Sequence, residues 1–510
     1  MIGDFFRKAL KKKKKTNPFQ EYSNSKEIQI KAQLIDADLE KTITLFKQLY
    51  SFPENTDVKF RTFQIAGLNK TACLLTINTI TDINIIEEFV LTPLLTNMNR
   101  SIEIEDLLAV QSLSTVSIIK EAVAEINIGN AILFIEGYSK AFSISATNFQ
   151  GRDVNSAENE VTLKGPKEAF TEKASTNISL IRKRIKNENL IVESTTISKR
   201  SNNQLYIIYM KDIANEKLLG NIKNRINALN VDAIQNLSLL EQHIEERQLS
   251  LFPTILNTER PDRATSFIED GYIVLIMDNS PDCLVLPATF WSFFHISEDH
   301  YLRYIYGNFT RALRMVAIFI TLFISSIYVG ITNYHSEMIP PDLLLAISGT
   351  REKVPFPALI EVIMMEFAFG LIREGGLRVP TPVGPTIGIV GALILGQAAV
   401  QANIVSPIVV IVVALGGVCS FLVSDINLNF SIRIIRFFFI LSSGLFGFFG
   451  MTALFVAGLF YMVSLKSFGV PYLAPMTPRY ASSKDTLFRR TLKNEIFRPG
   501  YVKPKDMKKT

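Results

Sequence analysis

The sequence predicts an α/β soluble N-terminal region, in two subdomains, followed by an α-helical integral membrane domain. Three observations predict this fold class. Residues before about 310 mix charged and apolar side chains, residues 313–465 are mostly apolar, and residues 466–510 are strongly basic. The chain has 510 residues, which is long enough for two or three domains.

Changes in composition along the chain also predict the domain boundaries. We expect a basic flexible arm at 1–27, a first α/β subdomain at 28–150, and a second at 151–300 that includes a hairpin and a charged junction. A membrane domain at 301–465 follows, with about four spans and a glutamate-bearing helix at 356–372. A basic tail at 466–510 ends the chain.

Alternating runs of strand-like and helix-like sequence predict the α/β character of the soluble region. Apolar runs bounded by turn residues indicate strands and hairpins, and apolar residues at helical spacing indicate helices. The expected strands are 72–78 and 204–210, the hairpins 131–147 and 272–287, and the helices 102–128, 177–186 and 215–229.

The membrane domain is predicted from apolar segments long enough to cross a hydrocarbon core of about 30 Å. These are 313–332, 384–400, 404–423 and 437–465, the last long enough to tilt or kink at Gly444, Gly447 and Gly450. Arginines before the first span place the soluble region on the cytoplasmic side, and the basic tail favours the same side. An even number of spans satisfies both, but it leaves Arg433 and Arg436 on the outer side, against the rule.

The glutamate-bearing helix at 356–372 is the most informative segment, because carboxylates at membrane depth cost roughly 2.5–3.5 kcal/mol on insertion scales. Glu366 and Arg373 are seven residues apart and share a face, while Glu361 lies about 140° round the helix from Glu366. Two interpretations are open. The helix is interfacial with Glu366 and Arg373 paired, or a carboxylate faces an ion path.

Two further features are candidate functional sites. Gln397 and Gln401 share a helix face and either bond across helices or line a polar cavity. The charged junction at 258–263 is either an exposed turn or a salt-bridged joint between soluble and membrane parts, and we favour the joint. The candidate pore or gating residues are Glu361, Glu366, Arg373, Glu374, Gln397 and Gln401, and the candidate coupling residues are Glu259, Arg260, Pro261, Asp262 and Arg263.

Composition and motifs argue against several functions. The chain contains no GxxxxGK[ST], GxSxG or HExxH motif, so we expect neither an enzyme nor a cofactor. Three cysteines without metal-like spacing predict neither a disulfide framework nor a metal site. The basic ends lack an aromatic-rich binding motif, so membrane lipid is a better partner for them than nucleic acid.

Several long strings stand out between about residues 130 and 478. They are GRDV at 151–154, TERPDR at 258–263, LPATFW at 286–291, EMIPPDLL at 337–344, IRIIRF at 432–437, SFGVPYLAP at 467–475, and the longer stretches 163–186, 351–380 and 388–407. These strings resemble the A subunit of the GerA-type spore germinant receptors. One departure from the family pattern is Gly375, where family members often have alanine.

The resemblance implies an integral protein of the spore inner membrane, with its N-terminal domain in the cytoplasm. It implies a permease-like B subunit and a lipoprotein C subunit as partners, with the nutrient bound by the B subunit. It also implies a homo-oligomer that forms a gated cation channel. The alternative is a non-conducting scaffold that assembles the receptor and relays the signal through its soluble domain.

Overall fold

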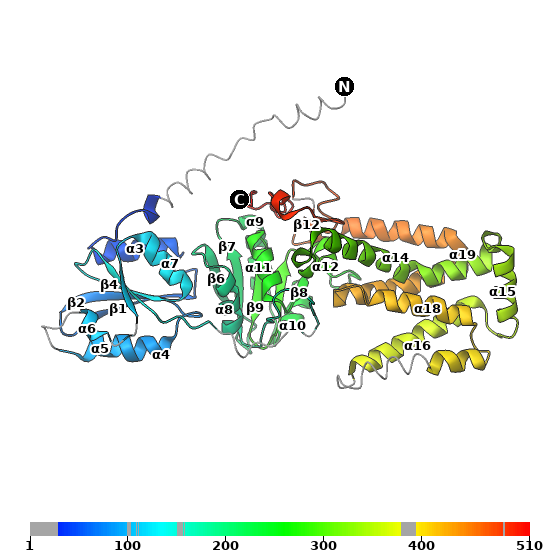
Figure 1. Cartoon of the computed structure of the whole chain (residues 1–510), viewed down its shortest axis with the longest axis horizontal. Coiled ribbons are helices and arrows are strands. Elements are labelled where there is room, and N and C mark those ends of the chain that lie inside the picture. Colours follow the sequence, from blue (N-terminus) through cyan, green and yellow to red (C-terminus); the bar gives the residue numbers. More distant parts are fainter. Residues whose placement is uncertain are drawn as a thin grey trace, which may run out of the picture. The chain divides into compact units, whose positions relative to one another are not determined.

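The computed structural model describes residues 29–98, 104–108, 110, 112–149, 157, 159–378, 394–482 and 485–509. The expected basic arm and most of the expected span at 384–400 therefore lie outside the described residues; 394–400 is helical. The predicted fold class is confirmed: α/β elements precede a helical C-terminal part (Figure 1). The chain divides into two compact units, one of residues 1–154, 173–196 and 204–211, and one of the remaining residues.

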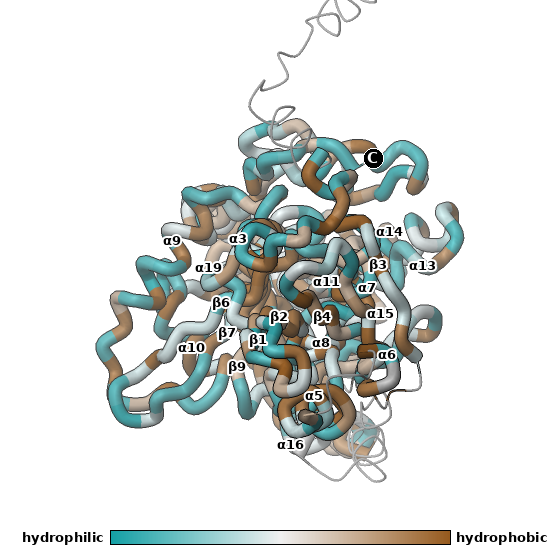
Figure 2. The backbone as a smooth tube through the Cα atoms, turned by 90° about the vertical axis from the view of Figure 1, so that its left-hand side faces the viewer, coloured by the Kyte–Doolittle hydropathy of each residue, from teal (hydrophilic) through white to brown (hydrophobic). Residues whose placement is uncertain are grey.

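The first unit contains a five-stranded antiparallel sheet. Its strands are β1 (Val58–Ile65), β2 (Lys70–Ile77), β3 (Leu113–Val116), β4 (Ala131–Ile135) and β5 (Ala141–Ile144), in the order β1-β2-β4-β5-β3. The pairing of β4 with β5 confirms the first expected hairpin. Both β2 and β4 are largely apolar (Figure 2), as expected for strands buried on both faces.

Helices cover both faces of this sheet. On one face, α3 (Leu39–Leu49) and α7 (Ile119–Ile128) pack on side chains such as Leu75 and Phe134. On the other, α4 (Ile83–Ile86), the π-helix η1 (Glu87–Leu91), α5 (Thr92–Thr96) and α6 (Ile104–Leu107) pack on side chains such as Leu74 and Leu133. Because adjacent residues of a strand point to opposite faces, two separate cores result.

The expected helix at 102–128 is wrong. The segment contains α6, then β3, then α7, because residues 113–116 pair with β5 as an edge strand. The apolar residues at near-helical spacing in this segment belong to three different elements. Pairing with β5 makes residues 113–116 a strand and not part of a helix. Helix α7 ends at Gly129, whose φ of 108° lies in the left-handed region that favours glycine.

The other expected soluble elements are present. Helix α8 (Ala174–Arg184) and strands β6 (Leu190–Ile197) and β7 (Asn203–Met210) belong to the first unit. In the second, β9 (Ile273–Met277) pairs antiparallel with β10 (Cys283–Leu286), which confirms the second expected hairpin, and β10 pairs with β8 (Leu256–Thr258). The helices of this part are α9 (Glu216–Asn227), α10 (Leu237–Ile244), α11 (Pro261–Glu269), α12 (Phe290–Phe294) and α13 (Glu298–Tyr301).

A helical bundle forms the rest of the second unit. Its helices are α14 (Tyr304–Tyr334), α15 (Pro341–Arg351), α16 (Ala358–Arg378), α18 (Pro407–Ser420) and α19 (Ile426–Ser464). A short 3-10 turn, η2 (Ser336–Met338), lies between α14 and α15. Helices α14, α18 and α19 run side by side (Figure 1). Within the described residues, α14 and α19 are long and apolar enough to cross a membrane.

Helix α19 reverses direction at Gly447. The sequence predicted instead a single span at 437–465 that tilts or kinks at its glycines. Gly447 has φ 60° and ψ −148°, outside the helical region. A Cβ at Gly450 would lie 2.5 Å from the carbonyl oxygen of Ser442, so the chain folds back on itself. Phe323 of α14 contacts both Phe439 and Phe455, one from each arm, at ring distances of 4.9 and 5.6 Å. The arms 426–446 and 448–464 therefore form a helical hairpin.

The described residues of the expected basic tail, 466–482 and 485–509, pack on the soluble part of the second unit. The hydroxyls of Tyr501 and Tyr272 lie 2.6 Å apart, and Asn215 Nδ2 donates to the carbonyl of Val502 at 3.1 Å. The segment contains the short strands β11 (Lys466–Ser467) and β12 (Val470–Pro471) and the 3-10 turn η3 (Leu492–Asn494). Tyrosines and valines interspersed among its cations are buried, so apolar packing holds it on the soluble part of the second unit.

Candidate gating and coupling site

Glu366 lies inside the helical bundle, with only 1% of its surface exposed. Its carboxylate forms an ion pair with Arg436 of the first arm of α19 and accepts a hydrogen bond of 2.7 Å from the Ser325 hydroxyl of α14. Of the two open interpretations, the pairing of Glu366 with Arg373 is therefore not the one found. Glu366 joins three helices, α14, α16 and α19, through one carboxylate.

Arg436 is the partner of Glu366 that sequence reasoning missed. Its guanidinium fits beside α18 because Gly416 has no side chain; a Cβ there would lie 3.3 Å from Arg436 Nη1. Nε and Nη1 of Arg436 are buried without a hydrogen-bond partner among the described residues. The available signal was an arginine spaced three residues from Arg433 in an apolar segment, which we assigned to a membrane surface.

Glu361 is fully buried one and a half turns before Glu366. One carboxylate oxygen lies 3.4 Å from Arg351 Nε at the end of α15, and the other accepts a 2.9 Å hydrogen bond from the backbone N–H of Ser406. Ser406 is the residue immediately before α18, so Glu361 places a negative charge at the N-terminus of that helix, where the helix dipole favours it. Glu361 thus connects α15, α16 and α18.

The remaining candidate gating residues have different surroundings. Arg373 Nη1 donates to the Ser420 hydroxyl at 2.6 Å, and its guanidinium lies 4.6 Å from the centre of the Phe421 ring, beside the end of α18. Glu374 is half-buried. Gln397 and Gln401 are exposed, so neither lines a cavity formed by the described residues.

The junction at 258–263 is a buried charge network and not an exposed turn. Arg260 pairs with Asp262 at 2.8 Å and donates to the carbonyl of Pro166 at 2.9 Å and the hydroxyl of Thr162 at 2.9 Å. Pro261 occupies the first turn of α11, where its missing N–H costs no hydrogen bond. Glu259 accepts a hydrogen bond from the side chain of Asn159.

Arg263 extends the network toward the bundle. It forms an ion pair with Glu160 and donates to the carbonyls of Ser292 and His295, at 2.7 and 3.0 Å, at the end of α12. Because one guanidinium satisfies two helix-terminal carbonyls and a carboxylate, Arg263 fixes α12 against α11. Burial lowers the pKa of His295 to about 4, so its ring is neutral near pH 7.

The network reaches α14 through α13. The Tyr301 hydroxyl donates to Asp262 at 2.6 Å. Asp299, fully buried, accepts from Arg311 Nε at 2.9 Å and pairs with Arg314 at 3.1 Å. Burial opposes ionisation of Asp299, but the hydrogen bonds and charges of Arg314 and Arg311 hold its pKa below the usual value. The candidate coupling residues thus connect α11 to the first turns of α14.

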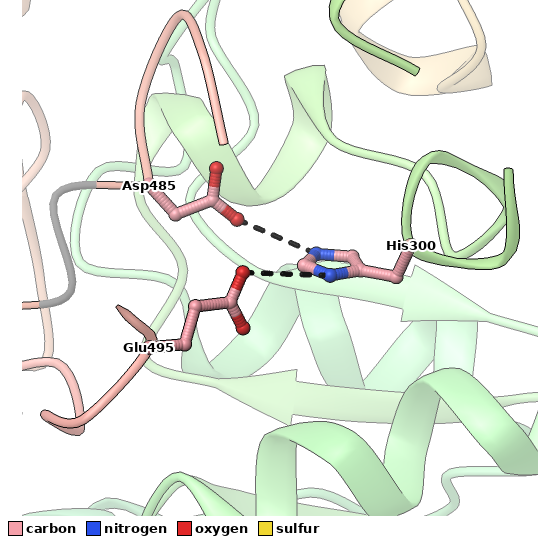
Figure 3. Close-up of side chains that lie close together, drawn as sticks. All are labelled: His300, Asp485 and Glu495. Carbon is pink, nitrogen blue, oxygen red and sulfur yellow. Dashed lines mark ion pairs between the residues drawn. The ribbon is translucent and has the colours of Figure 1, made fainter. Parts of the chain in front are cut away.

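A second cluster ties the C-terminal segment to the same place. Figure 3 shows His300 of α13 between the carboxylates of Asp485 and Glu495, at 3.4 and 3.9 Å. The three ligand atoms lie within 4.8 Å of one another, a spacing that also suits a metal ion. However, Arg311 already forms an ion pair with Asp485, so a divalent cation would face a guanidinium. We interpret the cluster as ion pairs that hold residues 485–495 against α13.

The comparison with protein families decides the identity of the chain. The model of the family described as Bacillus/Clostridium GerA spore germination protein matches residues 45–501. This chain belongs to the GerA family. Family membership supports a role in spore germination, and the two long apolar helices indicate association with a membrane.

Relatives of known name agree with the GerA assignment. Spore germination protein KA of Bacillus subtilis is 40% identical over 75% of this chain and 71% of its own length. Spore germination protein B1 of the same organism is 36% identical over 89% of this chain and 95% of its own length. The crystal structure of the N-terminal domain of the A subunit of the Bacillus megaterium spore germinant receptor GerK3 matches at 26% identity, covering 51% of this chain and 98% of that one, with a TM-score of 0.39.

The strings that suggested the GerA resemblance coincide with the two charged networks. TERPDR supplies Arg260, Asp262 and Arg263, and IRIIRF supplies Arg436. The stretch 351–380 supplies the two buried glutamates. In this GerA protein, the most recognisable sequence therefore holds helices together by charge, as well as by apolar packing.

Proposed function

We propose that this chain is the A subunit of a nutrient receptor that triggers spore germination, and that its helical bundle contributes to a gated cation channel. The observation that carries the proposal is the buried Glu366–Arg436 pair. Burying such a pair carries a desolvation cost, and ionisable residues inside membrane bundles are rare and mark ion paths, relays or sensors. Two guanidinium nitrogens without hydrogen-bond partners among the described residues support an incompletely satisfied, releasable contact.

The pair acts as a latch in this proposal. With Glu366 bound to Arg436 and Ser325, helices α14, α16 and α19 are held together and the path is closed. Opening separates α16 from α19 and hydrates both charges. A ligand on the receptor favours this state only by its difference in affinity for the two states. Because both carboxylates are buried between helices, we assign Glu361 and Glu366 to gating in the closed state, and to pore lining only after opening.

The proposed signal route runs through the junction network. Movement of α11 reaches α13 through the hydrogen bond between Asp262 and Tyr301, and reaches α14 through Asp299 and its two arginines. The partners are a permease-like B subunit, which binds the nutrient, and a lipoprotein C subunit, and several copies of this chain surround the path. The membrane is the spore inner membrane, with the soluble region in the cytoplasm. The basic sequence around α14 and after α19 supports this orientation.

Potassium release from spores tests the proposal. Spores carry either the native chain or Glu366→Gln, and a panel of amino acids and nucleosides is applied. Glu337→Gln serves as the control, because Glu337 is exposed beyond the end of α14. We expect altered release in Glu366→Gln at normal protein level and native release in the control. Native release in both variants would contradict a gating role for Glu366.

A non-conducting scaffold is the alternative to a channel. The buried junction favours it in one respect, because this network firmly anchors the soluble elements to α14. Expression of residues 1–302 and 303–510 as separate chains distinguishes the two functions. Restoration of the nutrient response without the covalent link supports the scaffold, whereas loss of response with both parts present at the membrane supports mechanical coupling to a gate.

A further inference from the structure

The loop between α10 and β8 exposes two leucines that no described residue of the soluble part covers fully. Leu249 is 98% exposed and Leu251 is 41% exposed. Both follow Arg247 in the sequence RQLSL at 247–251. The Leu249 side chain, almost wholly in water, gains nothing from folding, and Leu251 beside it is partly exposed, so together they indicate a surface that is covered in the working protein.

The loop is fixed to the last turn of α19. Arg247 donates to the Ser464 hydroxyl at 3.1 Å and to its carbonyl at 3.4 Å, which satisfies the end of the helix. The Tyr461 hydroxyl donates to Ser250 at 3.2 Å, and the rings of Tyr461 and Phe252 lie 6.2 Å apart. Ser464 is also the last residue of the apolar arm 448–464. The two leucines are therefore held beside the C-terminal end of the apolar arm 448–464.

The charges around the loop fit an anionic surface. Arg247 is exposed, and so is Lys466, two residues after the end of α19. The two carboxylates that precede the loop are turned into the protein. Glu245 accepts from the Thr254 hydroxyl at 2.9 Å, and Glu246 pairs with Arg225 at 3.1 Å. The outer side of the loop thus presents leucines and cations.

We propose that residues 247–251 insert into the membrane at the boundary between headgroups and acyl chains, with anionic phospholipid as the partner. The proposal rests on the inference that α14 and α19 cross the bilayer. Continuity with the end of α19 favours lipid over a protein partner, since the leucines extend an apolar surface that lipid already covers. Leucines inserted beside cations are the arrangement that binds anionic interfaces.

Fluorescence quenching by brominated lipid tests the insertion. The chain has one tryptophan, Trp291, which is buried and gives the same background in every variant. Three variants of the full-length chain are reconstituted into vesicles. Leu249→Trp reports on the loop, Phe319→Trp reports on the middle of α14, and Leu492→Trp reports on an exposed site fixed near the start of α14 by Arg489, which donates to the Leu302 carbonyl at 2.7 Å.

The three positions lie at different expected depths. Since a helix rises about 1.5 Å per residue, the start of α14 at Tyr304 lies roughly 14 Å before the apolar run that starts at 313. In vesicles of brominated phosphatidylglycerol we expect Leu249→Trp to lose at least about half of its added emission, and Leu492→Trp to lose little. In brominated phosphatidylcholine we expect weaker quenching of Leu249→Trp, and Arg247→Gln should remove that difference.

The outcomes separate this proposal from the membrane assignment. Quenching of Phe319→Trp without quenching of Leu249→Trp overturns the loop proposal while α14 still spans. Absence of quenching at both positions means that the membrane assignment itself fails. A blue-shifted but unquenched Leu249→Trp identifies a covering protein surface and overturns the lipid proposal. Equal quenching in the two lipids overturns the role of the anionic headgroup.

Discussion

Glu366 and Arg436 should depend on each other for stability in a way that a double-mutant cycle can measure. Arg436→Met leaves the buried Glu366 carboxylate with Ser325 alone. Glu366→Gln leaves Arg436 without a counter-charge, although two of its nitrogens already lack hydrogen-bond partners among the described residues. Each single variant isolates one buried charge, while the double variant removes both.

The expected magnitudes follow from burial of the pair. Removing one partner of a buried ion pair costs about 3–5 kcal/mol, whereas replacing both by neutral residues of similar size is close to neutral. We therefore expect the double variant to recover much of the loss, with a coupling energy of at least about 3 kcal/mol, the upper end of the range for residues in contact. At about 1.4 kcal/mol per tenfold change, a coupling of about 3 kcal/mol shifts a two-state gate by more than roughly 100-fold.

The assay is thermal and denaturant unfolding of the full chain in detergent, paired with potassium release from spores that carry the same variants. Arg433→Met combined with Glu366→Gln is the matched control, because Arg433 is half-buried one turn earlier in the same arm and stacks near Phe430. Its coupling should be clearly smaller. Additive effects of Glu366→Gln and Arg436→Met, within about 0.5 kcal/mol, would refute the latch.

Three further outcomes are expected. Gly447→Ala should destabilise the helical hairpin by about 1–3 kcal/mol, because Gly447 has a positive φ that alanine adopts only with strain. Gly458→Ala should not destabilise it, because there is open space around Gly458. Unfolding of both variants measures the difference. Tyr301→Phe should cost about 1.5–3 kcal/mol, since its hydroxyl reaches a buried carboxylate, and should slow germination. Buried His295 has a pKa of about 4 in the folded protein, below its usual value of about 6.5. The free energy of unfolding should therefore fall as the pH drops below about 6.5, by about 2 kcal/mol at pH 5. Unfolding of His295→Gln over the same pH range should show less of this loss.

The sequence was sufficient for features that depend on local pattern. Both hairpins, the buried strands of the first sheet and the long apolar α14 follow from alternation, turn residues and hydropathy, which act over a few residues. The reversal at Gly447 was not predictable, because glycine in an apolar run is equally compatible with a kink and a turn. The contacts with α14 decide between them.

The partners of the buried charges could not be predicted for a related reason. Helical spacing places Glu366 and Arg373 on one face, which makes a local pair plausible, yet Glu366 binds an arginine 70 positions later in the chain. The density of charge around Pro261 also singles out residues 258–263 as a candidate contact site. The partners of that site, Glu160 and Tyr301, could not be predicted, because only the fold brings them close.

The two charged networks differ in how completely they are satisfied, and this difference argues for different roles. In the junction, Arg260 and Arg263 donate to carboxylates, hydroxyls and carbonyls, so their bonding capacity is largely used. In the bundle, Arg436 keeps two nitrogens without hydrogen bonds among the described residues. A saturated network resists change and transmits movement as a rigid joint, whereas an unsaturated one gains hydrogen bonds when water enters. Hydration of Arg436 would therefore offset part of the cost of opening, which places the moving contact in the bundle and the rigid one at the junction.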